Sequence, residues 1–90
     1  MEMPELLEEV RVQYPPAARQ AGTQGAVRLL VDVDERGRVL HAKVLKGPGL
    51  GLEQAAAAAL RKFRFRPARD HAGRAVPVRI LYSYLFRLGD

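Results

Sequence analysis

The chain has 90 residues, of which 48% are hydrophobic and 28% charged, and its formal net charge is +5. This length allows one domain, and the composition is typical of a globular protein. Cysteine is absent, which excludes a disulfide framework and a thiolate metal site. No apolar run approaches the ~20 residues that span a bilayer, and the acidic first residues lack the basic start of a secretion signal. We therefore expect either a cytoplasmic protein or a piece of a longer one.

The first part of the chain is predicted to be a lead-in to the domain. Residues 1–13 are polar and acidic, and we expect a linker there with a short helical turn over residues 4–10. The domain itself is expected to span residues 14–90. A short helix is predicted over residues 15–21, because two prolines suit a first helical turn, alanines propagate it and Gly22 ends it.

Two strands are predicted next. Val27, Leu29, Val31 and Val33 alternate with more polar residues, which indicates a half-buried strand. The turn over residues 34–38 contains a glycine that can adopt the positive φ of a tight hairpin. Residues 39–46 then form the returning strand.

A helix is predicted over residues 52–63, where five consecutive alanines favour helix strongly. Its apolar face comprises Leu52, Ala56, Ala59, Leu60 and Phe63. The glycine-rich residues 47–51 precede this helix but lack the Gly-Lys-Ser/Thr ending of a phosphate loop, so we interpret them as a connector.

The last fifteen residues form the longest periodic segment of the chain. Every second position is apolar, at Val76, Val78, Ile80, Tyr82, Tyr84, Phe86 and Leu88. This pattern predicts a long strand with one face on the core, pairing beside the first strand and lying at a sheet edge, where Pro77 is tolerated. The fold class is therefore α+β, a three-stranded antiparallel sheet with two helices on one face. The predicted core comprises Val27, Val31, Val44, Leu60, Phe63, Ile80 and Tyr82.

The sequence contains little that suggests catalysis, and we expect no enzyme, metal site, cofactor or small-molecule substrate. His41 and His71 are the only histidines and lie thirty residues apart in the sequence, and Asp32 and Asp34 are interpreted as a solvent-facing pair that leads into a turn. The basic stretch over residues 61–69 is interpreted as a solvated helix end. The alternative, a nucleic-acid or lipid surface, is less favoured because Phe63 and Phe65 are expected to be buried and unavailable for stacking.

Several segments together resemble a known family. The first segment is Tyr14-Pro15 followed by Ala17-Ala18-Arg19, Gly22 and Gly25, and the second is the turn Asp34–Val39. The third is residues 55–68, which end in Phe63-Arg64-Phe65-Arg66-Pro67-Ala68, and Gly73 and the terminal strand complete the match. The order and spacing of these segments resemble the TonB C-terminal domain over residues 10–88. One departure is Phe63, where the family usually has tryptophan. A phenylalanine fills the core but lacks the indole N–H donor.

The resemblance implies a function. Domains of this family capture the TonB box, a short extended segment of outer-membrane transporters, while ExbB and ExbD drive the rest of the protein from the inner membrane. It also implies a periplasmic location in a Gram-negative bacterium and an excised domain of an inner-membrane-anchored protein. Strand addition to the terminal strand is the implied mode of capture. The expected peptide-binding residues are Tyr14, Pro15, Arg19, Gln20, Val78, Arg79, Ile80, Leu81, Tyr82 and Ser83. Of these, Arg79, Leu81 and Ser83 are expected to point outward beside the added strand.

Two alternatives remain open. The domain could serve assembly in another cell-envelope machine, or pair its terminal strand with a second copy in a strand-exchanged homodimer. Tyr14 could fix the entry to the first helix rather than contact a ligand.

Overall fold

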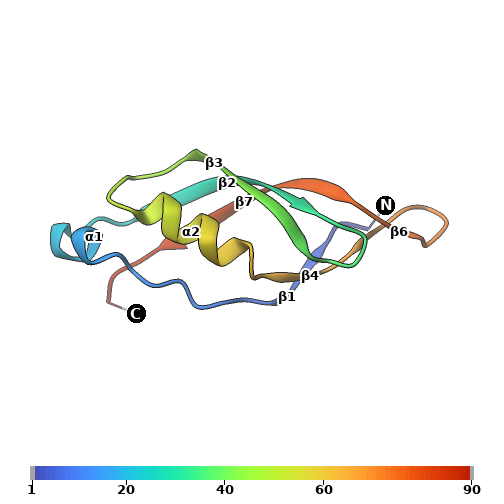
Figure 1. Ribbon diagram of the computed structural model, residues 1–90, viewed down its shortest axis with the longest axis horizontal. Coiled ribbons are helices and arrows are strands. Elements are labelled where there is room, and N and C mark those ends of the chain that lie inside the picture. The colour runs from blue at the N-terminus through green and yellow to red at the C-terminus, as the bar shows by residue number, and fades with distance from the viewer. Residues whose placement is uncertain (1, 90) are drawn as a thin grey trace.

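A three-stranded antiparallel sheet with two helices on one face forms the domain (Figure 1), as predicted from the sequence. The computed structural model describes residues 2–89. The strand order is β3-β2-β7, so β2 is central and β3 and β7 form the edges. These elements are β2 (Gly25–Val33), β3 (Val39–Lys46) and β7 (Val78–Phe86), with α1 (Pro16–Ala21) and α2 (Leu52–Leu60).

The two neighbours of β2 pair with it differently. The β2–β7 ladder runs through nine consecutive pairs from Gly25–Phe86 to Val33–Val78 without a shift in register. The β2–β3 ladder shifts register twice, which leaves Leu40 and Leu45 as extra residues on β3. β-Bulges of this kind bend a strand and interrupt its pairing. The edge formed by β7 is therefore regular, and the edge formed by β3 is not.

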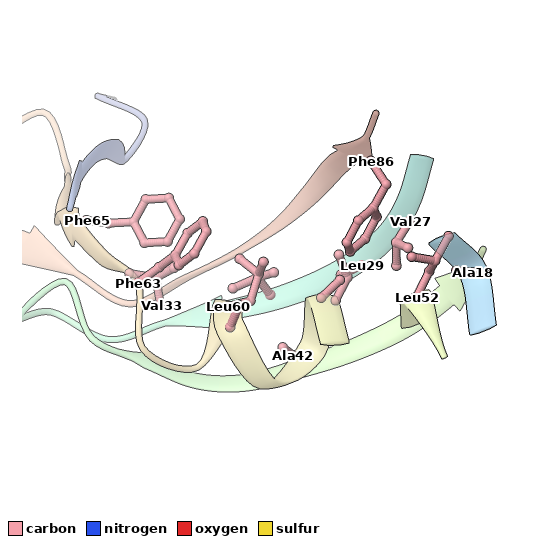
Figure 2. Close-up of a cluster of buried hydrophobic side chains, with 13 residues drawn as sticks. Ala18, Val27, Leu29, Val33, Ala42, Leu52, Leu60, Phe63, Phe65 and Phe86 are labelled. Atoms are coloured by element: carbon pink, nitrogen blue, oxygen red, sulfur yellow. The ribbon is translucent and has the colours of Figure 1, made fainter. Parts of the chain in front are cut away.

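The hydrophobic core lies between the sheet and the helices (Figure 2). Alternate residues of β2 are fully buried, and α2 covers them with two leucines and two small alanines. Burying a leucine side chain stabilises the fold by about 1.5–3 kcal/mol. The buried cluster comprises Ala18, Val27, Leu29, Val31, Val33, Ala42, Leu52, Ala56, Ala59, Leu60, Phe63, Phe65 and Phe86. Of the predicted core residues, Val44, Ile80 and Tyr82 are partly buried and pack against this cluster.

Short strands extend the domain beyond the main sheet. β1 (Glu5–Glu8) pairs with β4 (Arg64–Arg66), and β5 (Ala68–Arg69) pairs with β6 (Ala75–Val76). The predicted helical turn over residues 4–10 is therefore wrong, because β4 supplies hydrogen-bonding partners that local sequence does not reveal. Residues 10 and 12 also pack against the core rather than forming a free linker.

The predicted end of the second helix also needs correction. α2 ends at Leu60, and the amides of Lys62 and Phe63 bond to the carbonyls of Ala59 and Leu60, three residues back. Such tightened bonds commonly close a helix. Of the basic stretch over residues 61–69, Arg61 and Lys62 therefore form an exposed helix end as predicted. The rest of the stretch does not, because Arg64 and Arg66 are exposed on β4 and flank the buried Phe65.

Two turns of the same design close the β2–β3 and β5–β6 hairpins. In each, an aspartate accepts the amide N–H groups two and four residues later and the Nε of an arginine, at Asp34–Arg38 and at Asp70–Arg74. Asp34 forms a turn as predicted, but it is 5% exposed and so does not face solvent. Burial raises the pKa of Asp34, and hydrogen bonds from the Arg38 and Arg36 amides and the Arg38 side chain outweigh it, so that the pKa lies below its ordinary value.

Candidate functional site

The outer edge of β7 is open along the strand. Within residues 2–89, β7 pairs only with β2. In an antiparallel ladder, alternate residues of an edge strand direct their N–H and C=O groups away from the neighbouring strand. Over nine residues these groups form a regular row of donors and acceptors that an extended peptide can bind.

The opposite edge, β3, is much less suitable for pairing. It is bulged at Leu40 and Leu45 and carries Lys43 and Lys46. Bulges and lysines are the devices that discourage edge-to-edge pairing of sheets. The two free edges therefore differ, and the regular one belongs to β7.

The side chains of β7 alternate between the core and solvent, as the period of two predicted. Val78, Ile80, Tyr82 and Tyr84 are partly buried and Phe86 is buried, whereas Arg79, Leu81, Ser83 and Leu85 are exposed. Tyr82 makes edge-to-face contacts with Phe63 and Phe65, with ring centroids 6.0 and 6.2 Å apart. Such aromatic contacts hold the inner face of the strand and leave its outer edge unoccupied.

Tyr14 connects the entry of α1 to the end of β7. Its ring lies edge-on to Phe86 with centroids 5.4 Å apart, and its hydroxyl donates a hydrogen bond to the Thr23 carbonyl oxygen. The Arg19 guanidinium lies 5.2 Å from the centroid of the same ring. Tyr14 therefore has a structural role, whatever its contribution to ligand binding.

A groove of about 840 Å³ lies beside this aromatic contact. One wall comes from the segment leading into α1 and from α1 itself, and the other from the end of β7. The lining residues are Arg11, Val12, Gln13, Tyr14, Pro16, Arg19, Tyr84, Leu85, Phe86 and Arg87. Three of them are arginines and, among the groove residues that the structure describes, none is acidic, so the groove is electropositive.

Ionisable groups on β7 are perturbed by their neighbours. The Arg79 Nε lies 2.7 Å from Asp32 Oδ1 across the β2–β7 pair, and this hydrogen bond lowers the pKa of Asp32. Burial raises the pKa of the Tyr82 and Tyr84 hydroxyls, and the nearby Glu9 raises both further. Both tyrosines are therefore neutral at physiological pH.

The predicted site residues fall into two groups. Val78, Arg79, Ile80, Leu81, Tyr82 and Ser83 lie on β7, and Tyr14 and Arg19 lie in the groove at the other end of that strand. Pro15 faces the other side, in a hollow against α2 and near Gly51. Gln20 is exposed on α1 and lines neither hollow.

Sequence reasoning missed the residues that complete the groove. Arg11, Gln13, Tyr84 and Arg87 come from segments that are far apart in the sequence and meet only in the folded chain. One local signal was available, since Val10, Val12 and Tyr14 alternate and all three pack against the core. This alternation indicates an extended segment with one buried face rather than a linker.

Other kinds of site are not evident in the described chain. Among residues 2–89, no cluster of three or more histidine, aspartate or glutamate side chains could hold a metal ion. None of the described helices has the length and apolar character that crossing a membrane requires.

Comparisons with known proteins agree with this architecture. The family model described as "Gram-negative bacterial TonB protein C-terminal" matches residues 10–88. The chain is 42% identical over 64 residues to "Protein TonB" of Xanthomonas campestris pv. campestris (strain B100), covering 70% of this chain and 29% of the relative. It is 32% identical over 71 residues to "Protein TonB" of Yersinia enterocolitica, covering 76% and 28% respectively. The chain thus spans less than a third of these relatives.

A solved structure shares the fold. The solution NMR structure of the Pseudomonas aeruginosa TonB CTD superposes with a TM-score of 0.74 at 24% identity, covering 97% of this chain and 88% of that one. The family match also confirms the prediction that the chain is not an enzyme. On the match over residues 10–88, this chain belongs to the family of Gram-negative bacterial TonB protein C-terminal domains.

Proposed function

We propose that this domain is the receptor-binding module of a TonB-type energy transducer. In this proposal it lies in the periplasm of a Gram-negative bacterium, joined to an inner-membrane anchor that ExbB and ExbD drive. It captures the TonB box of outer-membrane transporters and transmits force to them for substrate uptake. Family membership supports the transducer assignment.

The observation that carries the proposed mode of capture is the open, bulge-free edge of β7. An added strand forms main-chain hydrogen bonds along this row, which gives affinity with little demand on the ligand's sequence. Arg79, Leu81 and Ser83 are exposed on this strand and flank the added segment.

The groove at the end of β7 supports the same mode. A peptide that follows the β7 edge toward Phe86 reaches Tyr14 and Arg19, which the family resemblance implies as binding residues. Arg11 and Arg87 line the same groove and contact the peptide at that end. Pro15 and Gln20 lie outside the groove, so we assign them a minor contribution.

Backbone methylation of the ligand tests the mode without disturbing the protein. A synthetic TonB-box peptide is N-methylated at one residue at a time, and its affinity for the 90-residue chain is measured by isothermal titration calorimetry. Strand addition predicts losses at every second position, of about tenfold for each hydrogen bond lost. The matched control replaces the same residues by alanine with the backbone intact. If the losses follow side-chain identity and lack the period of two, strand addition is wrong.

The open edge also favours a second candidate, an assembly domain that pairs β7 with its own copy. Two antiparallel β7 strands would join two sheets without covering the helices. Sedimentation velocity at increasing protein concentration distinguishes the candidates. A concentration-dependent dimer that the TonB-box peptide does not dissociate supports the assembly domain, and a monomer at all concentrations excludes it.

A further inference from the structure

Residues 2–89 leave the face of the sheet opposite the helices uncovered, and this face carries exposed leucines. Leu81 and Leu85 on β7 are 64% and 50% exposed, and Leu40 and Leu45 on β3 are 62% and 50% exposed. The two bulges place Leu40 with His41 opposite Asp32, and Leu45 with Lys46 opposite Arg28. Leu30 lies between the strands, paired with Leu81 and Lys43. Scattered single leucines are ordinary on a surface, but five on one sheet face form a patch.

Cations are interspersed among these leucines. Arg28, Lys43, Lys46 and Arg79 lie on the same face by register. Among the described residues of this face the one acid is Asp32, and Arg79 already pairs with it at 2.7 Å. The uncovered face, defined by these leucines and cations, therefore attracts an anionic partner.

This arrangement of leucines and cations disfavours two possible occupants, a second copy of the chain and another folded protein. A second copy packed face to face would bring lysines and arginines against one another, which is unfavourable. Protein interfaces use aromatic anchors that fill pockets and are depleted in lysine. Within residues 2–89, the uncovered face carries no phenylalanine, tyrosine or tryptophan. The hollow that its residues line lies at one end, between Leu40 and Pro77.

An anionic bilayer needs neither pockets nor aromatic anchors. Leucines insert at the level of the headgroups, and the long lysine and arginine side chains extend to the phosphates around them. The molecule is also elongated, with extents of 50 × 22 × 17 Å, so a broad face can lie along a surface. We propose that the uncovered face of the sheet docks on an anionic phospholipid membrane, with β7's outer edge still open.

Vesicle binding tests this proposal independently of peptide capture. The 90-residue chain is titrated with vesicles of phosphatidylcholine that contain phosphatidylglycerol, and with vesicles of phosphatidylcholine alone. Binding is expected to the anionic vesicles only and to weaken as salt is raised. Lys43→Gln is expected to weaken binding about fivefold, from the loss of one cation near the surface. Leu45→Gln is expected to weaken it by about fivefold as well, from the loss of a partly inserted side chain.

Matched controls lie elsewhere on the chain. Leu50→Gln changes a leucine that is 48% exposed in the loop before α2, and Lys62→Gln removes a cation that lines the hollow on the helix side. Both should bind anionic vesicles as the unchanged chain does. Lys43 and Leu45 lie on the edge opposite β7, so their variants should keep wild-type affinity for the TonB-box peptide.

Several outcomes would overturn membrane docking. These are no binding to anionic vesicles, equal binding to neutral vesicles, or binding that only the control variants weaken. Poly-L-glutamate serves as a competitor that mimics an acidic protein. If it binds more tightly than the vesicles and loses affinity with Lys43→Gln, the occupant is an acidic polypeptide and the membrane proposal is wrong.

Discussion

Gly37 and Gly73 provide a matched pair for testing how the β2–β3 turn is held. They occupy the same position in the two aspartate turns, with φ of +81° and +80°. Their surroundings differ, because a Cβ at Gly73 meets no atom within 4 Å, whereas one at Gly37 lies 1.8 Å from the Phe65 carbonyl oxygen. Gly37 also accepts a hydrogen bond from the Phe65 amide at 2.9 Å.

The two alanine variants should therefore differ in stability. Each places an L-residue in the left-handed region at a cost of ~1–2 kcal/mol, partly offset by a less flexible unfolded chain. Gly73→Ala should lower the free energy of unfolding by about 1 kcal/mol in sum. Gly37→Ala must also displace β4, which loses a backbone hydrogen bond worth about 1 kcal/mol. The variant also loses part of the packing of Phe65, so Gly37→Ala should lower the free energy of unfolding by about 3–5 kcal/mol in all.

Urea denaturation followed by circular dichroism measures both values. An unchanged slope with a shifted midpoint reports stability alone. The melting temperatures of the two variants should differ by about 10 °C or more. If Gly37→Ala and Gly73→Ala lose equal stability, β4 does not lie against the turn, and the reasoning is refuted.

Two further predictions concern Tyr14 and acid stability. Tyr14→Phe should lower the free energy of unfolding by about 1 kcal/mol, because the hydrogen bond to Thr23 is lost. The affinity for the TonB-box peptide, measured by isothermal titration calorimetry, should be unchanged. If the variant instead has wild-type stability and lower affinity, the hydroxyl acts in binding. The pKa of Asp34 lies below its unfolded value of about 4, so the ionised carboxylate stabilises the folded chain at neutral pH. This stabilisation is lost as the pH falls below the unfolded value and through the folded pKa. Asp34→Asn should flatten this acid dependence of the urea midpoint, and an unchanged pH profile would contradict the assignment.

Elements with strong local patterns were predictable from the sequence. The alternation over residues 76–88 predicted β7 and the direction of its side chains, although the observed strand is shorter and Val76, before Pro77, belongs to β6. The five alanines predicted α2. Gly37 and Asp34 marked the turn correctly. In each case the local preference and the tertiary environment agree.

Elements that depend on distant partners were not predictable. β1 has four exposed residues and no buried face, so only its pairing with β4 makes it a strand. Asp34 was assigned to solvent because sequence shows its turn but not its burial under the hairpin. The groove joins Arg11 to Arg87, and that proximity follows from the β2–β7 pairing rather than from any motif.

The uninterrupted β2–β7 ladder has a mechanical consequence. A segment paired along β7 and pulled along its own axis loads the hydrogen bonds in shear, so they resist together rather than one at a time. β7 passes this tension to β2 through nine pairs in register, and no bulge concentrates strain at one of them. Pulled at right angles, the same junction would unzip from one end. The direction of the applied force therefore determines how long a segment paired with β7 stays bound.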